Sequence, residues 1–189
     1  MKWSKIFERK TTLPLTIVNT TNINLNDDIR SQLERKRTRF KQNIITFNHN
    51  EITIPNKFIT STKASLECLM AHNNVGHTLP RLTAGIKMPD EYYLDTTQKN
   101  AFIIEKKTQQ TLGSVDEKIQ AATFKQLILR KKFNSDWNVF YMFCFSDWFK
   151  QGYQEELKYF DTIGVPIFWG QDEDYHLNVL KFIKEKTKE

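Results

Sequence analysis

The sequence has few of the residues that mark disulfide-rich or disordered chains. Its 189 residues include two cysteines, six glycines and five prolines. Two cysteines are too few for a disulfide framework, and neither has a zinc-binding spacing, so Cys68 and Cys144 are expected to be buried thiols of a reducing compartment. The scarcity of glycine and proline excludes a low-complexity chain. We therefore expect a single domain over residues 1–189, with a full core.

Long apolar runs are missing as well. No segment approaches the roughly 20 consecutive apolar residues that span a bilayer. Residues 1–14 lack the unbroken apolar stretch of a secretory signal peptide. The expectation is a soluble, cytoplasmic protein that has no membrane partner.

Acidic residues are outnumbered, since 22 of them face 28 lysines and arginines, for a formal net charge of +6. This balance favours an anionic partner such as nucleic acid. Basic residues are densest between Arg30 and Lys41, where the one acid is Glu34. We expect a helix here, capped by Asp27 or Asp28. Its basic face is either only solvated or contacts DNA phosphates, through Arg30, Arg35, Arg37 and Arg39.

The sequence does contain a β-hairpin pattern between Pro89 and Lys107. Pro89-Asp90 opens the first strand, residues 96–100 form a polar turn, and an apolar run ends in Glu105-Lys106-Lys107. Because side chains alternate along a strand, Glu105 and Lys107 share a face. Pairing across the hairpin is expected to bring Asp90 beside them. Carboxylate oxygens suit Mg²⁺, and a metal beside a lysine suits phosphodiester hydrolysis.

Pro89-Asp90 and Glu105-Lys106-Lys107 resemble the signature of the PD-(D/E)XK nuclease superfamily, which includes most type II restriction endonucleases. The resemblance implies that Asp90 and Glu105 bind Mg²⁺, with Mn²⁺ as a substitute. It implies that Lys107 orients or helps to deprotonate the attacking water and stabilises charge on the phosphate. Lys106 departs from the family, where this position is usually apolar, so we expect its side chain to extend out of the sheet end. The alternative is an ion-paired strand end without catalysis.

The remaining pattern predicts an α/β fold with a mixed sheet flanked by helices. From about residue 60 the order is helix, three strands, helix, strand, helix, strand, helix, with a first strand at 79–88 and a crossover helix at 115–132. The crossover makes the later strands parallel to the strand that ends in Glu-x-Lys. This order resembles the αβββαβ core of restriction endonucleases. Residues from about 60 to 189 are then the catalytic core, and residues 1–58 an N-terminal addition in which such enzymes often carry specificity elements.

Two further residues are candidates for the site of this core. Glu67 lies in the helix before the sheet, and it is either a surface group or, as the resemblance implies, an extra catalytic acid aimed at the metal through a water. Gln109 continues the face of Glu105 and Lys107 by alternation and is expected to point toward the DNA or its scissile phosphate.

Polar residues also lie at the start of the next helix and in a loop. The helix start comprises Ser114, Glu117, Lys118 and Gln120. These residues either only cap the helix or contribute to the site, in which case Lys118 is a candidate DNA contact. His72 and His77 have no third ligand at metal spacing, so they are either solvated or contact phosphate.

The sequence thus predicts a Mg²⁺-dependent endodeoxyribonuclease of double-stranded DNA, in the first instance a type II restriction endonuclease. Such enzymes usually act as homodimers, because a two-fold protein reads a palindromic site. One alternative is a structure-selective nuclease, such as a phage or repair enzyme, a junction resolvase or a transposon end-cleaving subunit. The other alternative is a DNA-binding module whose catalytic site has decayed.

Overall fold

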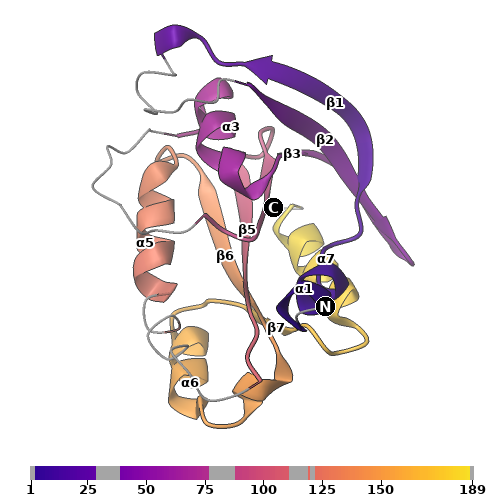
Figure 1. Ribbon diagram of the computed structural model, residues 1–189, viewed down its shortest axis with the longest axis vertical. Coiled ribbons are helices and arrows are strands. Elements are labelled where there is room, and N and C mark those ends of the chain that lie inside the picture. Colours follow the sequence, from indigo (N-terminus) through magenta and orange to yellow (C-terminus); the bar gives the residue numbers. More distant parts are fainter. Residues whose placement is uncertain (1–2, 29–38, 77–87, 111–118, 120–121, 188–189) are drawn as a thin grey trace.

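The computed structural model describes residues 3–28, 39–76, 88–110, 119 and 122–187. They form a seven-stranded sheet whose strands lie side by side in chain order (Figure 1). Neighbours are antiparallel from β1 to β5 and parallel from β5 to β7, which confirms the predicted α/β fold with a mixed sheet. The strands are β1 (Thr16–Asn24), β2 (Arg39–His49), β3 (Ile52–Thr60), β4 (Glu91–Asp95), β5 (Asn100–Lys107), β6 (Asn138–Phe145) and β7 (Ile167–Trp169).

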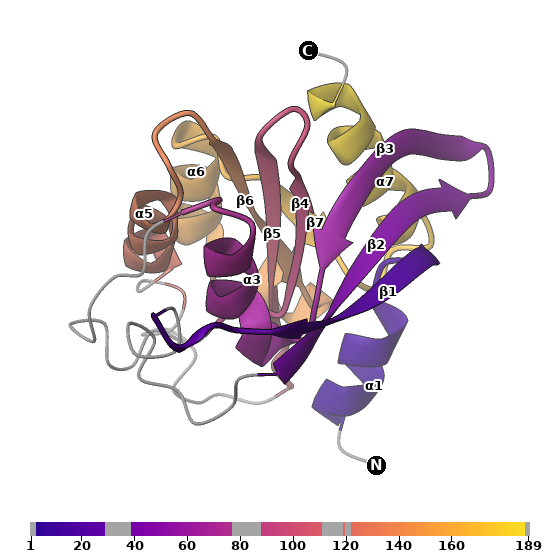
Figure 2. The same cartoon turned by 90° about the horizontal axis from the view of Figure 1, so that it is seen from above.

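Helices cover both faces of the sheet (Figure 2). One face packs against α3, α5 and α6, and the other packs against α1 and α7. Strands β5 and β6 are buried on both faces and are therefore apolar along most of their length. No helix among the described residues has the length and apolarity needed to cross a bilayer. The helices are α1 (Trp3–Lys10), α3 (Leu66–His72), α5 (Ala122–Lys132), α6 (Gln154–Thr162) and α7 (Tyr175–Lys186), with 3-10 turns η1 (Lys63–Ser65) and η3 (Asp147–Lys150).

The predicted hairpin is confirmed as β4 and β5, which pair in register from Glu91 with Ile104 to Asp95 with Asn100. The first strand begins at Glu91 rather than at Pro89, although the Asp90 N–H still donates to the Ile104 carbonyl at 3.1 Å. Asp95 closes the turn, because its carboxylate accepts the backbone N–H groups of Thr97 and Gln98 at 2.9 and 3.0 Å. The local pattern was therefore sufficient to predict this unit.

The helix predicted through Arg39 and Phe40 is wrong at its C-terminal end, and residues 29–38 lie outside the described residues. Arg39 instead begins strand β2, which pairs with β1 on one side and β3 on the other. Phe40 and Ile44 are partly buried against the core, while Arg39 and Lys41 are exposed. This is the period of two of a strand, but the many basic residues of the segment make it hard to recognise in the sequence. A helix at residues 3–10 was not predicted at all.

The N-terminal residues are built into the same sheet as the hairpin. Strand β3 is the antiparallel neighbour of β4, through the pair Ile59 and Leu94. Residues 77–87, most of the first strand predicted for the αβββαβ core, lie outside the described residues, so that specific order stays a prediction. Strands β1 and β2 and most of β3 come from the region that the resemblance places outside the core.

Both cysteines are buried thiols, as predicted, with Cys68 in α3 and Cys144 in β6. Burial raises the pKa of Cys144 to about 12. The thiolate is the nucleophilic form of cysteine, so Cys144 is inert at neutral pH.

Lys106 does not extend out of the sheet end, which corrects the prediction made for it. Its side chain is 4% exposed and forms an ion pair with Glu91 on the α1 and α7 face. The ammonium also donates to the Glu8 carbonyl at 3.1 Å and to the Thr12 hydroxyl at 3.3 Å. The C-terminal end of α1 supplies these oxygens, so a lysine is satisfied at a position where an exit to solvent was expected.

Replacing Lys106 with alanine should lower the free energy of unfolding by about 3 kcal/mol, because the Glu91 carboxylate then loses its cation in a nearly dry site. The double variant Lys106→Met with Glu91→Gln should recover most of that loss. Lys57→Ala, which removes an exposed lysine of β3, is the control and should leave stability nearly unchanged. Urea unfolding gives all three values, and an unaltered Lys106→Ala protein would contradict the role of this pair.

Candidate active site at one end of the sheet

Asp90 and Glu105 meet on the sheet face that packs against α3 and α5. Asp90 directly precedes β4, whose first residue, Glu91, lies opposite Ile104, so Asp90 comes to the end of β5 that carries Glu105. One oxygen of Asp90 accepts the backbone N–H of Lys106 at 2.8 Å, which fixes the orientation of the carboxylate. The Asp90 and Glu105 side chains are 14% and 5% exposed. The structure therefore brings together the two acids that the sequence singled out.

Tyr141 of β6 lies beside both carboxylates. Its pKa is raised well above the ordinary value, first by burial and then by the negative charges of Glu105 and Asp90. Among the described residues its hydroxyl has no hydrogen-bond partner. A neutral hydroxyl can donate to a carboxylate or to a bound ligand, so Tyr141 adds a polar group to the site.

Three lysines surround the two acids. Lys107 and Lys125 both pair with Glu105, the latter at 2.9 Å, and Lys63 of η1 pairs with Asp90. Three ammonium groups against two carboxylates leave a local excess of one positive charge. Lys107 and Lys125 are only 15% and 14% exposed, so water screens them weakly. The arrangement suits an anionic ligand such as a phosphodiester.

Lys63, Lys125 and Tyr141 were not predicted from the sequence as site residues. A signal for Lys125 exists, because Lys125 and Lys132 lie four and three residues from the buried Leu129 and so fall on the buried stripe of α5. These are the lysines of α5 that pair with Glu105 and Glu67. A lysine on an apolar stripe indicates a buried acid opposite it.

Glu67 pairs with Lys132 at 2.6 Å. Lys132 is seven residues along α5 from Lys125, about 10 Å on the helix axis, so this pair lies two turns away from the contact with Glu105. Gly76, which follows α3, also packs closely against the end of α5. A Cβ atom at this position would come 2.1 Å from the Lys132 carbonyl oxygen. The ion pair of Glu67 with Lys132 thus links α3 to α5.

Gln109 is placed differently from the prediction, whereas His72 is exposed to solvent, as one of its two predicted alternatives has it. Strand β5 ends at Lys107, so its alternation does not reach Gln109, whose N–H donates to the Ser146 hydroxyl at 3.3 Å. The His72 ring packs edge-on against Phe40. The other candidates lie outside the described residues, and they are Arg30, Arg35, Arg37, His77, Ser114, Glu117, Lys118 and Gln120.

The pair of carboxylates fits Mg²⁺ by its chemistry. Within the described part of the chain, no group of three or more histidines, cysteines, aspartates or glutamates is placed to hold a metal ion. Mg²⁺ commonly uses one or two protein carboxylates and takes its other ligands from water and from substrate phosphate. Asp90 and Glu105 supply such a pair, provided that their lysine partners turn toward the substrate.

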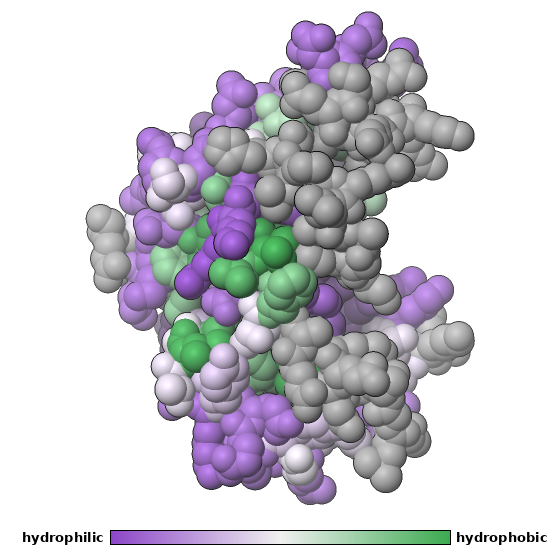
Figure 3. All heavy atoms as spheres, turned by 90° about the vertical axis from the view of Figure 1, so that its left-hand side faces the viewer, coloured by the Kyte–Doolittle hydropathy of each residue, from purple (hydrophilic) through white to green (hydrophobic). Residues whose placement is uncertain are grey.

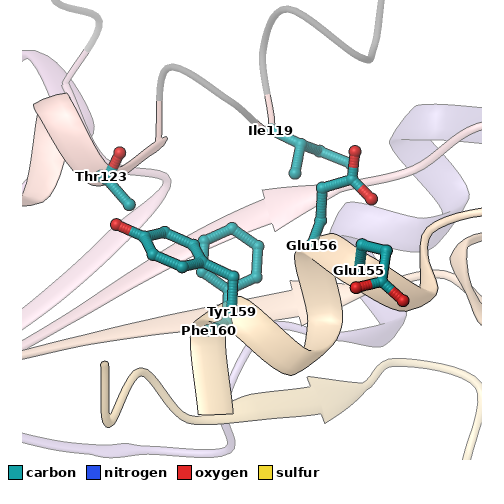
Figure 4. Close-up of a pocket in the computed structure, with 6 residues that line it drawn as sticks. All are labelled: Ile119, Thr123, Glu155, Glu156, Tyr159 and Phe160. Carbon is teal, nitrogen blue, oxygen red and sulfur yellow. The ribbon is translucent and has the colours of Figure 1, made fainter. Parts of the chain in front are cut away.

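A separate cavity of about 330 Å³ lies between α6 and two residues of the preceding part of the chain, Ile119 and Thr123 (Figure 4). Ile119, Tyr159 and Phe160 give it an apolar lining, and Glu155 and Glu156 lie at its edge. Apolar side chains are also exposed on this side of the molecule, which Figure 3 shows as a green patch. Two acids at an apolar cavity do not suit a polyanion, so this cavity is not the candidate nucleic-acid site.

No protein-family model, curated protein or solved structure matches this chain.

Replacing Glu67 with alanine should reduce stability by about 3 kcal/mol, because Lys132, 3% exposed, is left buried without its carboxylate. Adding Lys132→Met should restore most of the loss, which a metal-binding role for Glu67 would not predict. Asp136→Ala breaks the exposed pair with Lys99 and serves as the control, with no measurable change expected. The readout is thermal unfolding, and a Glu67→Ala protein as stable as the parent would refute the structural role.

Proposed function

We propose that the protein is a Mg²⁺-dependent endodeoxyribonuclease that cleaves double-stranded DNA, of the restriction-endonuclease kind. The observation that supports this most is that the hairpin brings Asp90 to the end of β5 that carries Glu105, with Lys107 two residues along on the face of Glu105. These are the residues that resemble the PD-(D/E)XK signature. The net charge of +6 also favours a polyanionic substrate.

The contacts of the residues support the roles that we propose for them. Asp90 and Glu105 would hold Mg²⁺, whose contribution when bound is Lewis acidity at the scissile phosphate. The Lys106 N–H keeps Asp90 in a fixed orientation. Lys107 and Lys125 are both held at Glu105 and bring two cations, with six N–H donors between them, to a poorly solvated place. Fixed donors of this kind stabilise the extra negative charge that develops on phosphorus oxygens during attack.

Purified protein should cut a large linear phage DNA into discrete fragments when Mg²⁺ or Mn²⁺ is present, because the proposed ligands are oxygens. EDTA should abolish cleavage, and a zinc-selective chelator should not. A smear in place of bands would exclude sequence-specific cutting and favour a structure-selective nuclease. Full activity in excess EDTA, or none under any condition, would overturn the proposal.

Alanine at Asp90, Glu105 or Lys107 should each slow cleavage at least ~100-fold, because each change removes a metal ligand or a cation at the phosphate. The matched controls are Asp136→Ala and Lys99→Ala, which remove an exposed acid and an exposed lysine of another ion pair. In Ca²⁺, Lys107→Ala should retain more of its DNA binding than of its cleavage in Mg²⁺. Circular dichroism verifies folding, and parental cleavage rates in any of the three variants would refute the site.

A further inference from the structure

Strands β1 and β2 are the outermost pair of the sheet, and they form a two-stranded ribbon from Arg39 to Gln42, because β2 pairs with β3 from Asn43 onward (Figure 1). Residues directly opposite in an antiparallel pair project from the same face, and successive pairs alternate between faces. The pairs Asn24 with Arg39, Asn22 with Lys41 and Thr20 with Asn43 therefore share one face. Ile23 and Phe40 lie on the other face, where they pack with Cys68 of α3. We call the first set, Thr20, Asn22, Asn24, Arg39, Lys41 and Asn43, the ribbon face.

The ribbon face is open to solvent. Asn43 is half-buried and the other five residues are exposed. Within the set, the Thr20 hydroxyl donates to the Asn43 side-chain oxygen at 2.9 Å. Two residues along β2 from Asn43, Ile45 is fully buried against the core that contains α1 and α7. The same side of the strand thus changes from core to exposed polar surface as it approaches Arg39.

The chemistry of this surface fits the edges of DNA bases. The 20 residues of β1 and β2 include no aspartate or glutamate, so nothing on either strand repels a phosphate backbone. The major groove of B-DNA admits a two-stranded β-ribbon. In that groove asparagine pairs with adenine, arginine and lysine pair with guanine, and threonine contacts either polar edges or the thymine methyl group. The ribbon face carries all of these side chains and no large apolar group, which disfavours a lipid surface or an apolar protein partner.

A hydrogen bond and a strand pair connect the ribbon face to the segment that carries Lys63, the partner of Asp90. The Lys41 carbonyl accepts a hydrogen bond from the Ser61 hydroxyl, and Ser61 is two residues before Lys63, the partner of Asp90. Asn43 pairs with Thr60 at the end of β3, next to the same turn. Both surfaces are therefore at the end of the sheet where β3 finishes and β4 begins. The ribbon face continues the side of the sheet that packs against α1 and α7, whereas Asp90 and Glu105 lie on the α3 and α5 side, so a duplex that contacts both has to pass around this end of the sheet.

We propose that the ribbon face enters the major groove of duplex DNA and reads base sequence for the nuclease. This inference rests on the proposed action on DNA. Asn22 and Asn43 carry the discrimination between base pairs. Arg39 and Lys41 contact either guanine or the phosphates that flank the site.

The test is selection of short duplexes with a randomised centre, in Ca²⁺ so that binding is separated from cleavage. The parent should enrich one sequence pattern. Asn22→Ala with Asn43→Ala should reduce the preference at one or more base pairs about 10-fold, while binding to the unselected pool changes little. The matched control is Asn19→Ala with Asn48→Ala, since Asn19 is exposed on the opposite face of β1 and Asn48 at the far end of β2.

A salt titration supplies a second measurement. Arg39→Ala with Lys41→Ala should either reduce the slope of log affinity against log salt by about one for each phosphate that is no longer neutralised, or weaken a preference for guanine. Lys158→Ala with Lys181→Ala removes two exposed lysines from α6 and α7 for the same change in charge, and should do neither. Circular dichroism and thermal unfolding establish that each variant is folded.

The outcomes separate the inference from the proposed function. An enriched pattern that is identical for the parent and both ribbon variants, with an unchanged salt slope, overturns the inference and leaves the nuclease intact. A parent that cuts DNA but enriches no pattern has the same meaning. A parent that neither binds nor cuts duplex DNA overturns both.

Discussion

Strand β5 is covered by helices on both faces, so each charged group at its end must be paired within the protein. Alternation along the strand sends Glu105 and Lys107 to one face and Lys106 to the other. On one side Glu105 meets Lys107 and Lys125, and on the other Lys106 meets Glu91 and the end of α1. The hairpin therefore carries two separate polar clusters, one around Lys106 and Glu91 and one around Asp90 and Glu105.

The two clusters differ in their balance of charge. Lys106 and Glu91 neutralise each other, and backbone and hydroxyl oxygens satisfy the remaining donors of the ammonium group. Around Asp90 and Glu105, three lysines exceed the two acids, and the Tyr141 hydroxyl stays neutral because its pKa is raised by burial and by both carboxylates. The extra cation, Lys63, is 49% exposed, whereas Lys107 and Lys125 balance the two carboxylates. The proposed binding of an anionic ligand on the α3 and α5 face rests on this cluster.

The N-terminal strands extend this arrangement outward. Strand β3 joins β4 to the ribbon of β1 and β2, so that the open edge of the sheet and the carboxylate pair belong to one continuous sheet. The nine residues of this edge strand include no lysine or proline, two of the residues that usually protect such edges, although its register shifts between Ile17 and Asn19. Its exposed amides and hydroxyls, together with the lack of acids on β1 and β2, are the features on which the proposed DNA contact of the ribbon face rests.

The sequence by itself determined the hairpin, the shared face of Asp90, Glu105 and Lys107, and the parallel strands that follow the crossover. The first two depend on turn residues and on a period of two, which are local, and the third depends on the right-handed crossover that links parallel strands. Other features depended on contacts between residues far apart in the chain. They are the pairing of Lys125 with Glu105 and of Lys63 with Asp90, the burial of the Lys106 side chain, and the strand that begins at Arg39. Lys125 and Lys106 could each point to solvent or to a buried acid, and a single sequence does not contain the distance to that acid. Only the tertiary structure decided these, because the free energy of a buried charge is set by the partners that packing brings to it.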